Sequence, residues 1–257
     1  MTRYLLKENR ISFSVIIPTL NTRHKYLLES IYSVINQTYK FFEIIVVNNG
    51  RNDINFPDSF MPIKQIKTIY KAGSAQARNI GVQFAKNNYV AFLDDDDLWA
   101  QDYLENIEKH ISRDNPDCLI GSLNQLKDEK ILPFKNAHGK LNKDIIFLKN
   151  PGITGSTVVV KKEVFIDIGG YNPKLPPSED KSLILELIKK KYKVVTVPES
   201  AAIIRHHSLG DRLTELFIVE GIFQFYHAYK NQMNLYQRLF NICRFLKYSW
   251  RKSKNVK

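Results

Sequence analysis

Short apolar runs alternate with amphipathic stretches along the first hundred residues of the chain. The runs lie at 13–18, 42–47, 63–70 and 89–93, and each has the length of a strand. Between them, apolar residues recur at helical spacing over 27–35 and 77–84. Strands that alternate with helices predict a mostly parallel, doubly wound sheet, which places the chain in the α/β class.

The pattern is less regular beyond residue 100. It predicts helices over 102–112 and 180–190, a loop with one short helix over 124–149, a turn at 169–173, and strands over 118–123, 156–160, 194–197 and 201–204. From Asp211 onward only helical periodicity remains. We therefore expect one domain over residues 1–210 and a helical extension over 211–257.

Net charge is the unusual feature of an otherwise ordinary globular composition. Of 257 residues, 44% are hydrophobic, while 38 Lys and Arg against 26 Asp and Glu give a formal net charge of +12. Such an excess favours an anionic partner, which can be nucleic acid, a phosphorylated ligand or a membrane surface. Charge alone does not choose among them.

Cysteine content and the amino terminus bear on the cellular location. Cys118 and Cys243 lie far apart and support neither a disulfide framework nor a thiolate zinc site, which fits a reducing compartment. Residues 1–8 lack an apolar core of signal-peptide length, and no stretch reaches the roughly 18 apolar residues of a spanning helix. We expect a cytoplasmic protein that is soluble or peripheral to the membrane.

Four consecutive aspartates, Asp94 to Asp97, follow the apolar run at 89–93. A buried strand there delivers negative charge to the carboxyl end of a sheet, where open α/β folds bind ligands. Carboxylate oxygens suit Mg²⁺ or Mn²⁺, which also bind substrate phosphates. A metal and diphosphate site is one interpretation, and a solvated acidic loop is the other.

The segment from Ala72 to Gly81 opens the helix that precedes the acidic strand. It offers Arg78 and backbone N–H groups to an anion. A helix start whose small residues pack closely on the sheet explains the segment equally well, because it matches neither a P-loop nor the dinucleotide fingerprint.

Five segments in this order resemble the family 2 glycosyltransferases. They are VIIPTLN at 15–21, SVINQT at 33–38, EIIVVNNG at 43–50, ARNIG at 77–81 and VAFLDDDD at 90–97. Together they span about a hundred residues, and the resemblance continues more loosely to Ser208.

The resemblance implies the nucleotide-diphospho-sugar transferase fold called GT-A, a sugar nucleotide donor, Mn²⁺ or Mg²⁺, and inversion at the anomeric carbon. It also implies roles for single residues. Pro18, Thr19 and Asn21 would line the nucleoside pocket, and Arg78 would lie near the base or the phosphate. Asp94, Asp95 and Asp96 would supply the D-x-D function, with Asp95 towards the ribose and Asp96 on the metal. Asp97 would contact the sugar or shape the loop.

Asn48-Asn49-Gly50-Arg51 departs from the Asp-Asp-Gly-Ser that many family members carry. In those members an acid accepts the uracil N3–H. An asparagine carbonyl also accepts that bond while its NH₂ donates to a ring carbonyl, so Asn48 and Asn49 retain pyrimidine recognition. The substitution leaves both uridine and thymidine open.

Glu179 and Asp180 are the second catalytic candidates. Ser178 can cap the helix that follows, and acids in a first turn gain about 0.3–1 kcal/mol from the helix dipole, so local structure alone explains the pair. The family, however, places an acidic pair here after a turn like Gly169-Gly170-Tyr171. Its aspartate is the general base, which implies that role for Asp180.

Two further segments resemble family elements. Residues 205–208 look like an Arg-x-His element that closes the metal or diphosphate side, with His207 as the match, although a surface turn explains them as well. Residues 152–157 resemble the acceptor-side segment, with Thr154 and Gly155 as contacts, and a plain loop would look the same.

The carboxyl-terminal tail combines apolar and basic residues. Leu235, Leu239, Ile242 and Leu246 share one helical face, and Arg244, Lys247 and Arg251 lie opposite. Such a basic amphipathic helix either rests on anionic lipid or packs on the domain with a solvated basic side.

We thus expect a metal-dependent inverting glycosyltransferase that moves glucose or galactose from a UDP-sugar to a lipid-linked or oligosaccharide acceptor in surface polysaccharide synthesis (O-antigen or capsule). Contact with the cytoplasmic face of the inner membrane would suit such an acceptor. A sugar-phosphate nucleotidyltransferase is an alternative, but the loop after its first strand must be Gly-rich. A nucleic-acid-binding domain is another, but four aspartates would repel its ligand, so we expect no nucleic acid partner.

Overall fold

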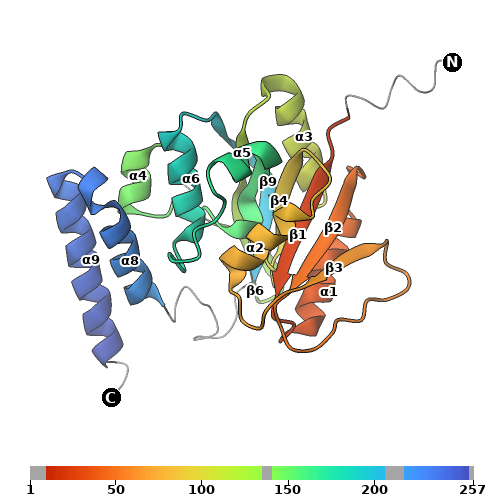
Figure 1. Ribbon diagram of the computed structural model, residues 1–257, viewed down its shortest axis with the longest axis horizontal. Coiled ribbons are helices and arrows are strands. Elements are labelled where there is room, and N and C mark those ends of the chain that lie inside the picture. The colour runs from red at the N-terminus through yellow and green to blue at the C-terminus, as the bar shows by residue number, and fades with distance from the viewer. Residues whose placement is uncertain (1–9, 135–140, 206–216, 255–257) are drawn as a thin grey trace.

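A single mixed sheet forms the centre of the molecule (Figure 1). The computed structural model describes residues 10–134, 141–205 and 217–254. Over these residues the strand order is β3-β2-β1-β4-β8-β6-β9-β5, with β7 paired to β6. The strands are β1 Phe13–Thr19, β2 Phe42–Asn48, β3 Ile63–Lys67, β4 Tyr89–Phe92, β5 Leu98–Trp99, β6 Cys118–Lys127, β7 Lys130–Pro133, β8 Val158–Lys161 and β9 Val194–Arg205.

Helices cover both faces of the sheet because strand residues point alternately to either side. Ile16 of β1 joins the hydrophobic cluster under α2 (Ser74–Gln83), α5 (Lys162–Asp167) and α6 (Glu179–Lys189). Val15 and Ile17 join the cluster under α1 (His24–Ile35) and α3 (Tyr103–Asp114). The predicted α/β class is confirmed.

The parallel order predicted from the sequence applies to the first half of the sheet. Strands β1 to β4 pair in parallel. Beyond them, β8 is antiparallel to both β4 and β6, whereas β9 is parallel to β6. The carboxyl ends of β1, β2, β4, β6 and β9 therefore lie at one edge, together with the start of β8.

The sequence pattern misjudged two segments. The strands predicted at 194–197 and 201–204 are one strand, β9, whose register with β6 shifts between Gly121 and Ser122. Pro198, which has no N–H to donate, lies in the stretch that bulges out. The predicted loop after residue 124 instead continues β6 and returns as β7, through Asp128 and Glu129 at φ 50° and 61°. The short helix expected there is α4, Lys143–Leu148.

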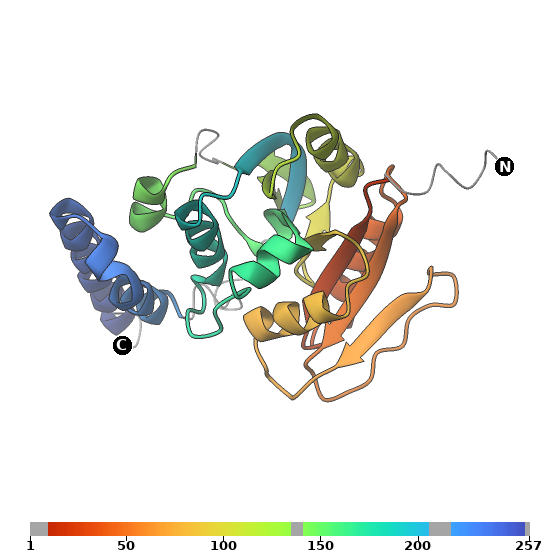
Figure 2. The same cartoon turned by 45° about the horizontal axis from the view of Figure 1, so that its top comes forward.

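Helices α8 (Ile218–Tyr229) and α9 (Leu235–Lys254), linked by a 3₁₀ turn, η2 (Lys230–Gln232), form a hairpin at the end of the molecule far from β2 and β3 (Figure 2). Phe225 and Tyr229 belong to the same hydrophobic cluster as α6. The domain boundary predicted near Asp211 lies outside the described residues. No helix in the described part of the chain is both long and apolar enough to cross a bilayer.

Candidate active site

The sheet edge that collects the strand ends also collects most of the predicted site residues. Thr19 ends β1, Asn48 ends β2, and Asp94 follows β4 after one residue. A 3₁₀ turn, η1 (Gly155–Thr157), leads into β8 at the same edge, and Ser156 Oγ accepts a hydrogen bond of 3.1 Å from the Asp94 backbone amide. The first turn of α6 adds Glu179 and Asp180.

Asp95 is tied to the loop that follows β1. The Thr19 hydroxyl donates to the Asp95 carboxylate and accepts a bond of 2.8 Å from the backbone amide of Asn21, which has φ 53°. Burial raises the pKa of Asp95 to about 7; the Thr19 bond opposes this shift, and Asp96 and Asp94 reinforce it. These contacts bring together Thr19, Asn21 and Asp95. Pro18 is buried within β1.

Asp96 is a partly exposed carboxylate that lies beside Arg23, a cation that sequence reasoning did not identify. Its Oδ2 lies 3.1 Å from Arg23 Nη1, and 26% of its side chain is exposed. The Arg205 Nε donates to the Asp96 carbonyl at 3.2 Å. A single arginine in a loop carries no spacing signal, so Arg23 emerges only from the fold.

Asp97 shapes the loop instead of facing an open site. It is buried, and its carboxylate accepts bonds from Ser156 Oγ at 2.7 Å and from the Arg205 backbone amide at 3.3 Å. Burial raises its pKa, and repulsion from Asp94 and Asp96 adds to this shift. Of the two roles expected for Asp97, these contacts support loop shaping.

Arg78, which we expected near the nucleotide base or phosphate, lies among the carboxylates. Only 3% of its side chain is exposed, Nη2 donates to Asp94, and Nη1 lies 3.7 Å from both Glu179 Oε1 and Asp180 Oδ1. Its guanidinium also lies 5.0 Å from the centre of the Tyr171 ring. Arg78 therefore holds the acidic loop and the start of α6 together.

Replacing Arg78 by Lys is expected to lower the free energy of unfolding by about 1–3 kcal/mol. A single ammonium cannot bond to Asp94 from one edge while facing Glu179 and Asp180 from the other. Urea unfolding followed by circular dichroism measures the change. Arg51→Lys, at an exposed arginine beside Tyr70, is the control and should change stability by less than about 0.5 kcal/mol. Equal effects of both substitutions would contradict the bridging role.

The two asparagines at the end of β2, Asn48 and Asn49, differ in whether their side-chain amides already have hydrogen-bond partners. Asn48 uses its amide within its own turn, donating to the Asn52 carbonyl at 2.8 Å and accepting from the Gly50 amide at 2.9 Å. Both polar groups of the Asn48 side chain thus already have a partner in the turn. Asn49 is buried, and its Oδ1 has no hydrogen-bond partner among the described residues. Asn49 is thus the better placed of the two to accept a bond from a pyrimidine.

The acidic pair of α6 is positioned by tertiary contacts. The Ser178 side chain forms no cap and instead donates to the Gly221 carbonyl at 3.5 Å, so the capping explanation is wrong. Glu179 accepts a bond of 2.8 Å from Ser74 Oγ. Burial raises the pKa of Asp180 to about 8, while Arg78 opposes the shift and the Gly155 amide bonds to the carboxylate.

The predicted acceptor segment lies against this pair. Gly155 is closely surrounded, since a Cβ there would overlap the Arg78 guanidinium and lie 2.9 Å from Asp94 Oδ1. A side chain at this position would displace the Arg78 guanidinium and the Asp94 carboxylate. Thr154 Oγ1, Glu179 Oε2 and Asp180 Oδ1 are buried without a hydrogen-bond partner in the described structure. Unsatisfied polar atoms gathered at one place indicate a ligand-binding site.

The acidic loop offers a divalent cation a small number of carboxylate ligands. No group of three His, Cys, Asp or Glu side chains within the described ranges is placed to hold a metal. Mg²⁺ and Mn²⁺ sites, however, need only one or two carboxylates where substrate phosphates complete the coordination. Asp94 and Asp96 are partly exposed carboxylates of the loop and fit that smaller set. His207 lies outside the described residues.

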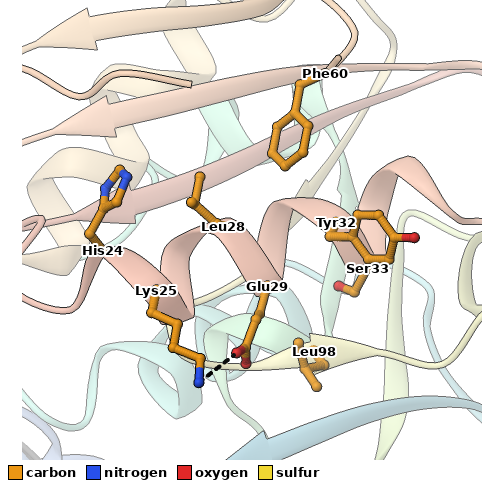
Figure 3. A pocket seen from close by; sticks show the side chains of 8 residues that line it. All are labelled: His24, Lys25, Leu28, Glu29, Tyr32, Ser33, Phe60 and Leu98. Carbon is orange, nitrogen blue, oxygen red and sulfur yellow. Dashed lines mark ion pairs between the residues drawn. The ribbon is translucent and has the colours of Figure 1, made fainter. Parts of the chain in front are cut away.

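A separate groove of about 660 Å³ runs along the outer side of α1 (Figure 3). Leu28, Glu29, Tyr32, Phe60 and Leu98 line it, and His24 and Lys25 lie at one end. None of its lining residues is one of the predicted site residues. The groove is therefore distinct from the carboxylate site.

Known proteins resemble this chain in sequence. The family described as Glycosyl transferase family 2 matches residues 14–169, more than half of the chain. The chain belongs to glycosyl transferase family 2. It is 30% identical to the E. coli UDP-Glc:alpha-D-GlcNAc-diphosphoundecaprenol beta-1,3-glucosyltransferase WfgD over 187 residues, 68% of this chain and 69% of WfgD. Glycosyltransferase GlyG of Streptococcus pneumoniae is 33% identical over 115 residues, which are 42% of this chain and 38% of GlyG.

Solved structures show the fold of this family member. The crystal structure of S. aureus TarS 1-349 in complex with UDP-GlcNAc aligns with a TM-score of 0.66 at 18% identity, covering 94% of this chain and 73% of that chain. The GT-A fold implied by the sequence resemblance is thereby confirmed. Family membership also argues against the two alternatives, a nucleotidyltransferase and a nucleic-acid-binding domain.

Proposed function

We propose that this family 2 member transfers a hexose from a UDP-sugar to a sugar acceptor with inversion of the anomeric carbon. One observation carries the proposal: the acidic loop after β4 and the acidic pair of α6 meet at one sheet edge, joined by Arg78. The donor diphosphate needs carboxylates that hold a divalent cation, and the acceptor hydroxyl needs a carboxylate that takes up its proton. This sheet edge provides the acidic loop for the first and the acidic pair for the second.

The donor side is formed by the ends of β1 and β2. Thr19 and Asn21 hold the loop beside Asp95, and the free carbonyl of Asn49 suits a pyrimidine N3–H. The names of two similar proteins support a uridine nucleotide, since WfgD is named for UDP-Glc and TarS was crystallised with UDP-GlcNAc.

A divalent cation, Mn²⁺ or Mg²⁺, fits beside Asp96 and Asp94. When bound, such an ion neutralises negative charge on a leaving diphosphate, a Lewis-acid effect worth several kcal/mol. Arg23, 3.1 Å from Asp96, holds that carboxylate in place. Asp97 fixes the loop through Ser156 and Arg205, so Asp96 keeps its position at the sheet edge.

Asp180 is the proposed general base. Its raised pKa brings the carboxylate close to neutral pH, where a base takes up the proton of a hydroxyl effectively. Arg78 and the Gly155 amide fix its orientation, and Glu179, held by Ser74, completes the acidic pair. Attack from the face opposite the leaving group inverts the anomeric carbon.

The acceptor is proposed to be a lipid-linked sugar or an oligosaccharide bound near Thr154 and Gly155. WfgD is named for a diphosphoundecaprenol-linked acceptor, which supports a role in surface polysaccharide synthesis, such as O-antigen or capsule. A lipid-linked acceptor would bring the protein to the cytoplasmic face of the inner membrane as a peripheral protein.

A panel of sugar nucleotides tests the function. The chain is incubated with UDP- and dTDP-hexoses, Mn²⁺ or Mg²⁺, and a lipid-pyrophosphate sugar, and nucleoside diphosphate release is measured. We expect release from UDP-glucose or UDP-galactose that depends on the acceptor and stops when EDTA is added. No binding of any sugar nucleotide under any ion condition would refute the proposal.

A further inference from the structure

Helix α9 turns its polar side inward and its apolar side towards solvent. Its buried residues are Gln237 and Asn241. Five of its exposed large apolar side chains lie on one face and are between 39 and 72% exposed: Leu235, Leu239, Ile242, Leu246 and Trp250. At 3.6 residues per turn they fall within about 80° of the helix circumference. We call these five residues the outer strip. A helix that only packs on its own domain would bury such a strip.

Hydrogen bonds fix the orientation of α9. The Gln237 amide donates to Asp144 of α4 at 2.9 Å, and the Asn241 amide donates to the Phe147 carbonyl, also in α4, at 3.0 Å. Rotating α9 to bury the outer strip would break both bonds and expose polar groups that are now satisfied. The outward direction of the strip is therefore a property of the fold.

Positive charge borders the outer strip. Residues 218–254 contain seven Lys and Arg but one acid, Glu220, and α9 itself contains no acid. Lys247, Arg251 and Lys254 lie along one edge of the strip and are exposed. Lys252 is occupied by Glu220 at 2.8 Å. The surface therefore combines exposed apolar side chains with uncompensated cationic ones.

We propose that the outer strip docks the protein on an anionic lipid bilayer, with α9 lying in the plane of the interface. The inference rests on the proposed function, which places the acceptor on a lipid. An apolar strip edged by Lys and Arg is the form of an interfacial helix. Trp250 suits the interface further, because its ring is apolar at one end and polar at the other.

A second copy of the chain is a weaker candidate for the same surface. Pairing two outer strips would bring the basic edges of two α9 helices together. Helical pairs normally offset such charges with acids at the flanking positions, and α9 has none to offer. A lipid surface that carries negative headgroups complements both the strip and its basic edge.

The hairpin of α8 and α9 packs directly on α6, the helix that carries Asp180. Ser182 Oγ and Tyr229 Oη lie 2.6 Å apart, Lys181 Nζ lies 3.3 Å from the centre of the Phe225 ring, and Gly221 packs on Pro177. Figures 1 and 2 both show α6 between the hairpin and the strands. Docking through α9 would therefore hold Asp180 at a set distance from the bilayer, as a lipid-linked acceptor requires.

Vesicle binding by the full chain tests the docking surface. Binding is measured by co-sedimentation and by tryptophan fluorescence, with phosphatidylcholine vesicles that contain or lack phosphatidylglycerol. We expect binding to the anionic vesicles only, with a blue shift from Trp250, because the other tryptophan, Trp99, is already buried. Leu239→Gln with Leu246→Gln should lower the partition constant at least about a hundredfold. Lys247→Gln with Arg251→Gln should lower it roughly thirtyfold.

Matched controls use equally exposed residues elsewhere. Ile69→Gln with Ile166→Gln removes exposed apolar side chains, and Lys25→Gln with Lys109→Gln removes exposed charges. Both should bind like the wild type. Absence of vesicle binding, binding that the strip variant retains, or a dimer in sedimentation velocity that the strip variant loses would overturn the proposal. UDP-sugar binding and transfer to a detergent-solubilised acceptor, measured without vesicles, report separately on the proposed function.

Discussion

Replacing Asp180 by Asn is expected to lower the rate of sugar transfer about 100- to 10,000-fold while donor affinity stays within about twofold. The substitution keeps the size of the side chain and its contact with the Gly155 amide but removes the ability to accept a proton. Single-turnover transfer and titration with the UDP-sugar measure the two quantities separately. Normal transfer by this variant would remove Asp180 from the base role.

The pH dependence of transfer gives the same test a second readout. Because burial raises the pKa of Asp180 to about 8, the carboxyl is protonated and inactive as a base below that pH. Transfer should therefore rise with pH and level off above about 8. The rise should be absent from Asp180→Asn. Glu179→Gln, which keeps an acceptor for Ser74, is the control and should retain the rise.

Replacing Asp96 by Ala is expected to lower turnover at least about a hundredfold, since it removes the partly exposed ligand proposed for the divalent cation. It should also reduce UDP-sugar affinity in the presence of Mn²⁺ to the value that the wild type shows in EDTA. Isothermal titration with and without the ion measures this.

Asp53→Ala provides the control for Asp96. Asp53 is a largely exposed acid that pairs with Lys67 at 2.6 Å, away from the acidic loop, so its loss should leave metal-dependent donor binding unchanged. An Asp96→Ala variant that binds the donor as tightly with Mn²⁺ as the wild type would contradict the assignment of this carboxylate to the metal.

Local patterns in the sequence were sufficient to predict the first half of the fold. The runs that became β1, β2 and β4 are buried almost throughout, so their apolar character is continuous and easily recognised. The turn at Gly169 and Gly170 was also predictable, because both residues have positive φ, which glycine adopts readily. Motifs located at strand ends then indicated where the acidic loop would lie.

Features that depend on tertiary contacts were beyond sequence reasoning. Ser156 connects Asp97 to the Asp94 amide, and Arg205 reaches the acidic loop from a strand more than a hundred residues away. The resemblance had marked the segments 152–157 and 205–208, but the atoms to which these two side chains bond follow from the fold alone. Helical spacing grouped the apolar residues of α9 correctly, but spacing does not say which face a neighbouring helix covers. The face of α9 that packs on α4 is set by the hydrogen bonds of Gln237 and Asn241.

The bridge that Arg78 forms also constrains how the halves of the protein can be recombined. The acidic loop and the acidic pair come from stretches about 85 residues apart in the chain, and one guanidinium forms ion pairs with both. In a chimaera that took its acceptor-side half from a relative, the buried charge of Arg78 would stay paired only if the incoming helix presented acids to it. Relatives can thus exchange acceptor-side segments, and with them acceptor preference, only where both carry the acids that pair with this arginine.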